Sequence, residues 1–287
     1  SKKCFKTTFN QLRLMAKKIF YVTTEIIPFA NVSTIADFSI NVPFILQEKG
    51  HDIRTIIPKY GFISERKYIL REVIRLREIP FEFAGEEHIA SAKSAFIPKS
   101  RVQIYFLEDD QWFKPLTNLL YKSKNGRVLS DNGERYGFFG KAVLATLPHL
   151  FWTPDIFMCN GWQAAFIPGL YKEFYEGKEF YKKIKTVMAV HDFNDYAVMN
   201  RKDVELAGIK VPKTSKGDAI NLYEVAAHYA DKIVVFDRPS DKISEKLLKL
   251  PGVQAHKKKI TKIAIKDDES PDYYTISDKL EQVFLKL

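Results

Sequence analysis

Side chains that could bind a ligand gather in four short segments, each of which follows an apolar, β-rich run of sequence. These segments are residues 25–33, 160–163, 191–196 and 237–240. Asn160, Gln163 and His191 can donate and accept hydrogen bonds. Trp162 offers an aromatic face, although a tryptophan at the start of a helix ordinarily packs in the core. A neutral sugar needs only these two kinds of contact, so these four residues are the first candidates for a binding site.

The first segment could hold an anion instead. Asn31-Val32-Ser33-Thr34 lies directly before a predicted helix, whose first backbone amides have no partner within the helix. A second interpretation needs no ligand, because Thr34-x-x-Asp37 resembles a helix capping box with aspartate in place of glutamate. The sequence has no Gly-x-Gly-x-x-Gly after its first predicted strand and no P-loop, so the two usual nucleotide-binding loops are excluded.

The cysteines and the other histidines indicate neither a metal site nor a catalytic nucleophile. Cys4 and Cys159 are too few for a disulfide framework or a thiolate cluster, which fits a reducing, cytoplasmic compartment. Cys159 ends a predicted buried strand, where packing is its expected role. No metal-ligand spacing and no Ser/His/Asp or Cys/His arrangement involves the histidines at positions 51, 88, 149, 228 and 256. We therefore expect no cofactor.

The elements that must position the four segments are strands that alternate with helices. Apolar, β-rich runs predict strands at residues 19–24, 52–57, 102–107, 155–159, 185–190, 232–236 and 260–265. Helical spacing predicts helices at residues 34–49, 131–147, 162–175, 218–229, 240–250 and 276–284, with a kink or break at Pro43. Turn signals at Ala84-Gly85 and Pro98-Lys99-Ser100 predict hairpins and edge strands between residues 68 and 113.

This alternation is typical of an α/β fold with a single Rossmann-like, doubly wound and mostly parallel sheet, here with an inserted hairpin region. The unbroken apolar run at residues 19–24 suits burial on both faces, so we expect this strand at the centre. Ligands of such sheets bind outside the carboxyl ends of the strands, where the four segments lie. Residues 15–287 are assigned to this one domain, and residues 1–14, basic and without periodicity, to a leader or upstream extension.

Charge and hydropathy narrow the class of protein further. The 287 residues carry a formal net charge of +10, concentrated in residues 1–14 and in residues 242–266, which hold eight lysines and one acid. Runs of this kind are ordinarily solvated faces, so we expect no nucleic acid partner. No apolar run approaches the roughly 18 residues that span a bilayer, so we expect no membrane association either.

A series of motifs occurs in one order over residues 18–237. It consists of Thr24-Glu25-Ile26-Ile27-Pro28-Phe29-Ala30 with Ile35-Ala36-Asp37, then Gly50-His51-Asp52-Ile53-Arg54, Pro58-Lys59-Tyr60-Gly61, Asp131-Asn132-Gly133-Glu134-Arg135-Tyr136, Pro154-Asp155-Ile156 up to Trp162-Gln163, Val190-His191-Asp192 and Tyr229-Ala230-Asp231-Lys232-Ile233. In type and order these motifs resemble the N-terminal, starch synthase catalytic domain of the bacterial glycogen synthase and plant starch synthase family.

The resemblance implies a retaining glycosyltransferase that moves glucose from ADP-glucose to the non-reducing end of an α-1,4-glucan. It also implies one half of an enzyme with two Rossmann-like domains across a cleft, the half that mainly holds the acceptor. His191 matches the family histidine that hydrogen-bonds the transferred sugar, and it is our candidate catalytic residue. The candidate substrate-binding residues are Trp162, Gln163, Asn160, Asn31 and Glu25.

The chain departs from the family pattern at the reaction centre. Asn31-Val32-Ser33-Thr34 stands in place of Lys-x-Gly-Gly, so a cation and two glycines suited to donor phosphate are missing. Asn160-Gly161 stands in place of His-Asp, which removes a carboxylate. Beyond Ile233 the sequence is long enough to complete this domain but not to add a donor-binding one, and we expect residues 270–287 to be its natural finish.

Two hypotheses of function remain open. In the first, the chain is a glycosyltransferase domain that is inactive alone and works with a partner chain supplying the donor-binding domain. In the second, it is a non-catalytic glucan-binding or regulatory module derived from the same family. Both give it an α-glucan or maltooligosaccharide as ligand, and the lost residues favour the second for this chain alone.

Overall fold

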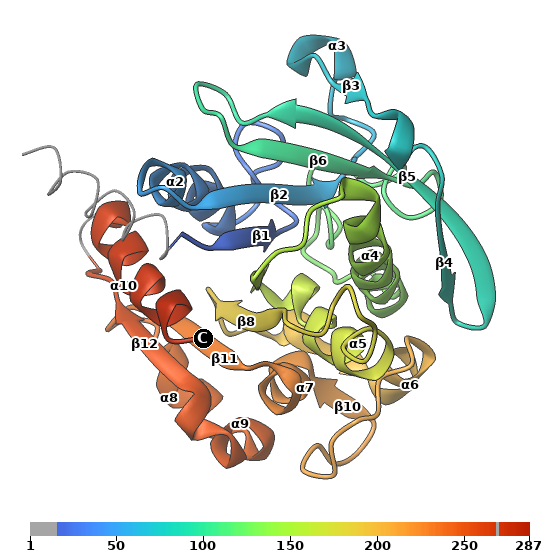
Figure 1. Ribbon diagram of the computed structural model, residues 1–287. Helices are drawn as coiled ribbons and strands as arrows, with labels where there is room; N and C mark the ends of the chain where they lie inside the picture. Colours follow the sequence, from blue (N-terminus) through green and yellow to red (C-terminus); the bar gives the residue numbers. More distant parts are fainter. Residues whose placement is uncertain (1–15, 268–269) are drawn as a thin grey trace, which may run out of the picture.

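The computed structural model describes residues 16–267 and 270–287, so the predicted leader at residues 1–14 lies outside the described residues. The main sheet (Figure 1) contains β1 (Lys18–Val22), β2 (Asp52–Pro58), β3 (Arg71–Glu72), β4 (Ile79–Phe83), β5 (Glu86–Phe96), β6 (Gln103–Glu108), β7 (Ile156–Asn160), β8 (Lys185–Val190), β11 (Lys232–Asp237) and β12 (Ile260–Ala264). Two short strands, β9 (Val198–Asn200) and β10 (Ala219–Asn221), form a separate antiparallel pair.

Seven neighbouring strands are parallel, in the order β12-β11-β8-β7-β1-β2-β6. β1 lies in the middle, and its residues 19–22 are completely buried. The chain runs outward from β1 through β2 to β6, returns to β7 on the other side of β1, and runs outward again to β12. This confirms the predicted doubly wound sheet and its central first strand. The strand order reverses between β1 and β7, so the expected ligand crevice lies at their carboxyl ends.

The structure describes nine α-helices, most of which pack in two groups. They are α2 (Ile35–Glu48), α3 (Glu65–Tyr68), α4 (Asn132–Thr146), α5 (Ile167–Phe174), α6 (Arg201–Leu206), α7 (Leu222–Tyr229), α8 (Ile243–Leu247), α9 (Pro251–Ala255) and α10 (Tyr273–Leu285). α2 packs against α10, whereas α4 packs against α5 and α6, and α5 packs against α7 (Figure 1). Within the described ranges, no helix is long and apolar enough to cross a membrane.

The inserted hairpin region forms as predicted. β5 pairs antiparallel with β6, β3 and β4, which gives the parallel sheet an antiparallel edge. Ala84 and Gly85 join β4 to β5 with φ angles of 54° and 81°, the left-handed values that a tight hairpin turn requires. Lys99 adopts a φ of 59° in the turn that precedes β6, where the sequence signalled a turn.

Two helices differ from the sequence predictions. α2 continues through Pro43, so the predicted break is wrong; a kink there stays a prediction. The helix predicted at residues 162–175 is a 3₁₀ turn, η3 (Trp162–Ala164), followed by α5. Pro168 lies in the first turn of α5, a position at which its missing amide proton costs no intrahelical hydrogen bond.

Further boundaries were missed in the last third of the chain. Residues 219–221 pair with β9 instead of starting a helix, and the Asn221 side chain then caps α7 by accepting a hydrogen bond from the Tyr223 amide. Lys242 has a left-handed φ of 49°, so α8 begins after it, later than predicted. Pro251 starts α9, which the sequence interpretation did not include.

Candidate functional site

The candidate site lies where the central strands end. Parallel strands end at the same edge of a sheet, so the segments that follow β1, β7, β8 and β11 share that edge. Thr24 and Glu25 follow β1, Asn160 is the last residue of β7, and His191 follows β8. These positions match the sequence prediction that ligand-binding segments gather at the carboxyl ends.

His191 and Asn160 are in direct contact. His191 Nε2 lies 3.1 Å from Asn160 Oδ1. The Asn160 amide nitrogen donates to the carbonyl oxygens of Val22, at 3.1 Å, and Met158, at 3.3 Å, which fixes Oδ1 as the acceptor toward the histidine. Nε2 therefore carries the ring proton and Nδ1 is a hydrogen-bond acceptor. Nδ1 is buried and has no partner among the described residues.

The surroundings of His191 keep its ring neutral. The ring packs against Phe38 and Phe236, at centroid distances of 4.8 and 4.7 Å. Burial among these apolar groups lowers the pKa of His191 to about 3, because the charged imidazolium would lose its hydration. His191 can thus accept a hydrogen bond through Nδ1 near neutral pH, but it cannot serve as a cation there.

The neutral His191 should make stability depend on pH. The folded state keeps the ring unprotonated down to about pH 3, whereas the unfolded chain protonates it near pH 6.5. The contribution of the neutral His191 ring to the free energy of unfolding is complete above pH 6.5 and is lost as the pH falls toward 3. Between pH 7 and pH 5 the free energy of unfolding should fall by about 2 kcal/mol more in the wild type than in His191→Gln. Urea unfolding of both proteins measures this, and an equal fall would contradict it.

Glu25 holds the loop that precedes α2. Its carboxylate is buried, and Oε2 accepts hydrogen bonds from the amides of Val32 and Ser33, both at 2.7 Å. Oε1 accepts a further bond from the Ser33 hydroxyl at 3.1 Å. Burial raises the pKa of Glu25, and these hydrogen bonds oppose that rise. The amides that could have cradled a phosphate are therefore bound to a carboxylate of the chain itself.

The capping box expected at Thr34 is wrong. Thr34 is in the αR conformation and its side chain makes no capping hydrogen bond to the helix. Ser33 takes over part of this role, since its hydroxyl accepts a hydrogen bond from the Ile35 amide at 3.2 Å. Asn31 lies exposed on the same loop.

Trp162 and Gln163 are buried at the start of η3. The Trp162 ring meets Tyr121 and Tyr136 edge to face, at centroid distances of 5.3 and 5.2 Å, and the residue is 1% exposed. It packs in the core and offers no open face to a sugar, so the expected stacking contact with Trp162 has no support in its geometry. Gln163 Oε1 is buried and has no hydrogen-bond partner in the described part of the chain.

Gly161 leaves no room for the side chain that the family pattern has at this position. Its φ is 77°, and a Cβ atom there would come within 2.7 Å of Ile35 Cδ1 and 2.9 Å of Gln163 Oε1. A side chain at residue 161 would therefore require the Ile35 and Gln163 side chains to move and a left-handed backbone that favours glycine.

Replacing Gly161 by alanine should destabilise the domain by about 2–3 kcal/mol, through the left-handed backbone and the crowded Cβ. Gly177 is the matched control, because a Cβ atom there meets nothing within 4 Å. Gly177→Ala should stay within about 0.5 kcal/mol of the wild type. Thermal or urea unfolding compares the two variants, and equal effects would show that Gly161 is not constrained.

A group of tyrosines and one carboxyl completes the site and was missed by the sequence analysis. Tyr60 donates to the Thr24 carbonyl at 2.9 Å, and Tyr223 donates to Asp192 Oδ1 at 3.3 Å. Burial raises the pKa of Asp192. Three residues of this group, Tyr60, Tyr136 and Asp192, could have been identified from the sequence, because they lie in the motifs on which the family resemblance rests.

Unpartnered polar atoms concentrate at this end of the sheet. Four of the six buried side-chain atoms that lack a hydrogen-bond partner in residues 16–267 and 270–287 belong to residues of this site: Thr24 Oγ1, Tyr136 OH, Gln163 Oε1 and His191 Nδ1. All four belong to uncharged groups. No group of three or more His, Cys, Asp or Glu side chains is placed to hold a metal ion in the described part of the chain.

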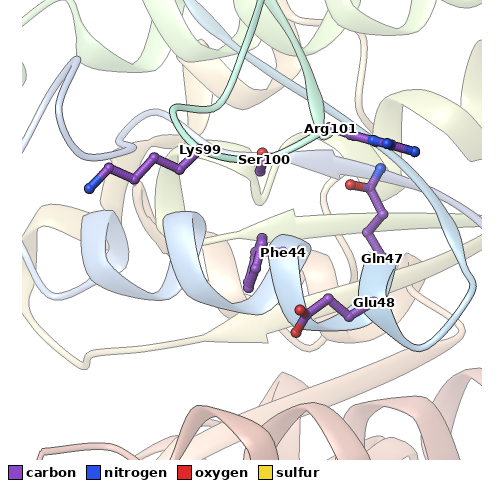
Figure 2. A pocket seen from close by; sticks show the side chains of 6 residues that line it. All are labelled: Phe44, Gln47, Glu48, Lys99, Ser100 and Arg101. Carbon is purple, nitrogen blue, oxygen red and sulfur yellow. The ribbon is translucent and has the colours of Figure 1, made fainter.

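A hollow of about 570 Å³ lies at the opposite ends of the strands. It is lined by Phe44, Gln47 and Glu48 of α2 and by Lys99, Ser100 and Arg101 of the turn before β6. Figure 2 shows that Lys99 and Arg101 point away from each other, so their charges do not converge on a common ligand. The candidate site therefore stays at the carboxyl ends.

The chain matches the family described as the starch synthase catalytic domain over residues 18–241. It is 34% identical over 224 residues to the glycogen synthase of Chlorobium limicola, an alignment that covers 77% of this chain and 46% of that protein. It is 32% identical over 240 residues to the glycogen synthase of Chlorobaculum tepidum, covering 82% of this chain and 48% of that protein. The chain thus spans about half the length of the curated relatives it matches.

The fold has a counterpart among solved structures. The catalytic domain of starch synthase IV from Arabidopsis thaliana, bound to ADP and acarbose, matches with a TM-score of 0.72 at 20% identity, over 87% of this chain and 51% of that one. This likeness shows the shared fold. Because the family match and the identity to the glycogen synthases extend over most of the sequence, the chain belongs to the starch synthase catalytic domain family, whose members are glycosyltransferases.

Proposed function

We propose that the chain binds an α-glucan at the carboxyl ends of its central strands and transfers no glucose by itself. The observation that supports this most strongly is the loop in front of α2, where Asn31, Ser33 and Thr34 replace a lysine and two glycines of the family pattern. The Glu25 carboxylate binds the Val32 and Ser33 amides of this loop. A donor diphosphate would compete there with an anion that is part of the chain. The loop also has no counterpart of the lysine and the two glycines that would bind the diphosphate in the family pattern.

A neutral glucan has no such competitor. Its hydroxyl groups could supply the missing partner of His191 Nδ1, because His191 is 8% exposed, whereas Tyr136 and Gln163 are as deeply buried as Trp162. Trp162 cannot make the aromatic contact, but a more accessible ring of the site, such as that of Tyr196, could make it. The centroid of the Tyr196 ring lies 5.0 Å from that of Tyr121. The proposed ligand is therefore a maltooligosaccharide held by hydrogen bonds and one aromatic face.

A second candidate is an acceptor-binding half that transfers glucose when another chain supplies a donor-binding domain. The length supports it, because the chain spans about half of its glycogen synthase relatives. The neutral His191 supports it too, since it lies at the sheet edge where the resemblance places a sugar-binding histidine.

Titration of a maltooligosaccharide into the wild type and two variants, followed by calorimetry, tests the glucan site. His191→Ala should weaken binding about five- to tenfold through the loss of one buried hydrogen bond. Asn31→Ala should leave binding unchanged, because Asn31 is exposed on the loop before α2 and is not among the residues with unpartnered buried atoms. Thermal unfolding of both variants controls for folding. Equal affinities for all three proteins, or no binding to the wild type, would overturn the proposal.

A further inference from the structure

A separate cavity of about 420 Å³ lies between the last turns of α4, the end of α5 and strand β4. Its wall is largely aromatic and includes Phe81, Phe174, Tyr175 and Tyr181. Tyr181 is held in place by its hydroxyl, which donates to the Leu144 carbonyl at 2.7 Å. The volume is within the range of small-molecule sites, and the walls come from well-packed elements.

Lys141 of α4 lines this cavity and is almost completely buried, at 6% exposure. Its Nζ lies 3.3 Å from the centroid of the Phe174 ring and 5.6 Å from that of Tyr175. Within the described ranges, Nζ makes neither a hydrogen bond nor an ion pair. Burial lowers the pKa of Lys141 to about 8. The aromatic faces thus attract the ammonium group, but they leave its N–H donors without an acceptor.

Two other partly buried lysines, Lys93 and Lys259, have oxygen partners. Lys93 Nζ pairs with Glu65 at 2.7 Å and with Glu108 at 3.2 Å. Lys259 Nζ donates to the carbonyl oxygens of Ala227 and His228, both at 2.9 Å. Lys141 differs from these two, because its Nζ has no oxygen partner in the described part of the chain and faces the cavity, where a bound anion could accept its hydrogen bonds.

The charges around the cavity favour an anion. Lys178 lines it as well, with Nζ 4.8 Å from the centroid of the Tyr175 ring, so two cations flank one aromatic ring. Glu82 of β4 is the acid in the lining; its charge attracts Lys141 without making an ion pair with it. His149, from the 3₁₀ turn after α4, also faces the cavity.

We propose that this cavity binds a small organic anion, a carboxylate or phosphate monoester carried on a ring or apolar body. The anionic group accepts hydrogen bonds from Lys141 Nζ, with Lys178 as the second cation. The body packs against Phe81, Tyr175 and Tyr181. The site is independent of the proposed glucan site, which lies at the carboxyl ends of the strands.

The proposal predicts a pH dependence with a definite sign. An anion pairs only with the protonated lysine, so affinity should fall as the pH rises through the pKa of Lys141 in the free protein. With that pKa at about 8, affinity for benzoate should fall about tenfold between pH 7 and pH 9. Lys178, Glu82, His149, Tyr175 and Tyr181 also face the cavity, so a variant must separate their titration from that of Lys141.

Benzoate and phenyl phosphate, titrated calorimetrically into the full chain at pH 7 and pH 9, test the site. The two probes separate a carboxylate from a phosphate preference, and saturation by either below roughly 10 mM supports the site. Lys141→Arg keeps the charge without titrating, so it should bind benzoate equally at both pH values. Lys141→Met should lose binding while it still unfolds cooperatively on heating.

Any one of three results would overturn the proposal. The first is that neither probe saturates the wild type at pH 7, and the second is that Lys141→Met binds as well as the wild type. The third is that the affinity of Lys141→Arg for benzoate still falls tenfold between pH 7 and pH 9. If Lys141→Met fails to fold, the pH profiles of the wild type and Lys141→Arg still decide.

Discussion

Purified on its own, the 287-residue chain should transfer no glucose from ADP-glucose to glycogen at a rate usable for synthesis. Transfer requires that the donor pyrophosphate be held and that water be excluded from the reacting sugar. In this chain the amides before α2 are bound to Glu25, and the chain spans about half the length of its glycogen synthase relatives. One side of a donor would therefore remain open to solvent.

The measurement is the release of ADP and the incorporation of labelled glucose into glycogen. A full-length bacterial glycogen synthase, assayed at the same concentration, shows that the conditions support transfer. Turnover by the isolated chain within about a hundredfold of that control, with contaminating synthase excluded, would contradict the expectation.

Replacing Glu25 by alanine should lower the free energy of unfolding by about 3 kcal/mol. The carboxylate accepts three hydrogen bonds, from the Val32 amide, the Ser33 amide and the Ser33 hydroxyl. Hydrogen bonds to a charged acceptor contribute about 1.5–3 kcal/mol each, and release of the buried charge from desolvation offsets part of their loss. The loop before α2 would lose the group that holds it to the end of β1.

Urea unfolding of Glu25→Ala, Glu25→Gln and Glu87→Ala measures this effect. Glu25→Gln keeps the volume and one acceptor oxygen, so it should lose roughly half as much stability as the alanine variant. Glu87 is an exposed glutamate of β5 and serves as the control, expected within about 0.5 kcal/mol of the wild type. A Glu25→Ala protein as stable as the control would show that the carboxylate does not hold the loop.

The sheet could be predicted from the sequence because its strands carry their own signal. The strand at residues 185–190 was predicted with the bounds of β8, since a run of β-branched and apolar residues buried on both faces has few alternatives. The β9–β10 pair could not be predicted, because each strand has three residues and forms only by pairing with the other. The starts of α7, after Asn221, and of α9, at Pro251, were missed as well.

Site residues at the ends of strands could be predicted from the sequence, but roles that depend on tertiary contacts could not. His191 and Asn160 were found because both follow apolar runs, and the structure brings them to 3.1 Å. The role of Glu25 as the acceptor for the loop was not visible, because its partners, seven and eight residues later, are backbone amides. For Trp162 the sequence allowed sugar stacking or core packing, and two tyrosine neighbours bury it in the core.

The preference for a neutral acceptor over a charged donor is the central claim, and one pair of titrations tests it most directly. A maltooligosaccharide and ADP-glucose are titrated separately into the same preparation, at low and at high salt. We expect weak maltooligosaccharide binding that is nearly independent of salt, because no phosphate charge is paired, and no saturable binding of ADP-glucose. Tight, salt-sensitive binding of ADP-glucose that is lost in a Ser33 variant would contradict the account.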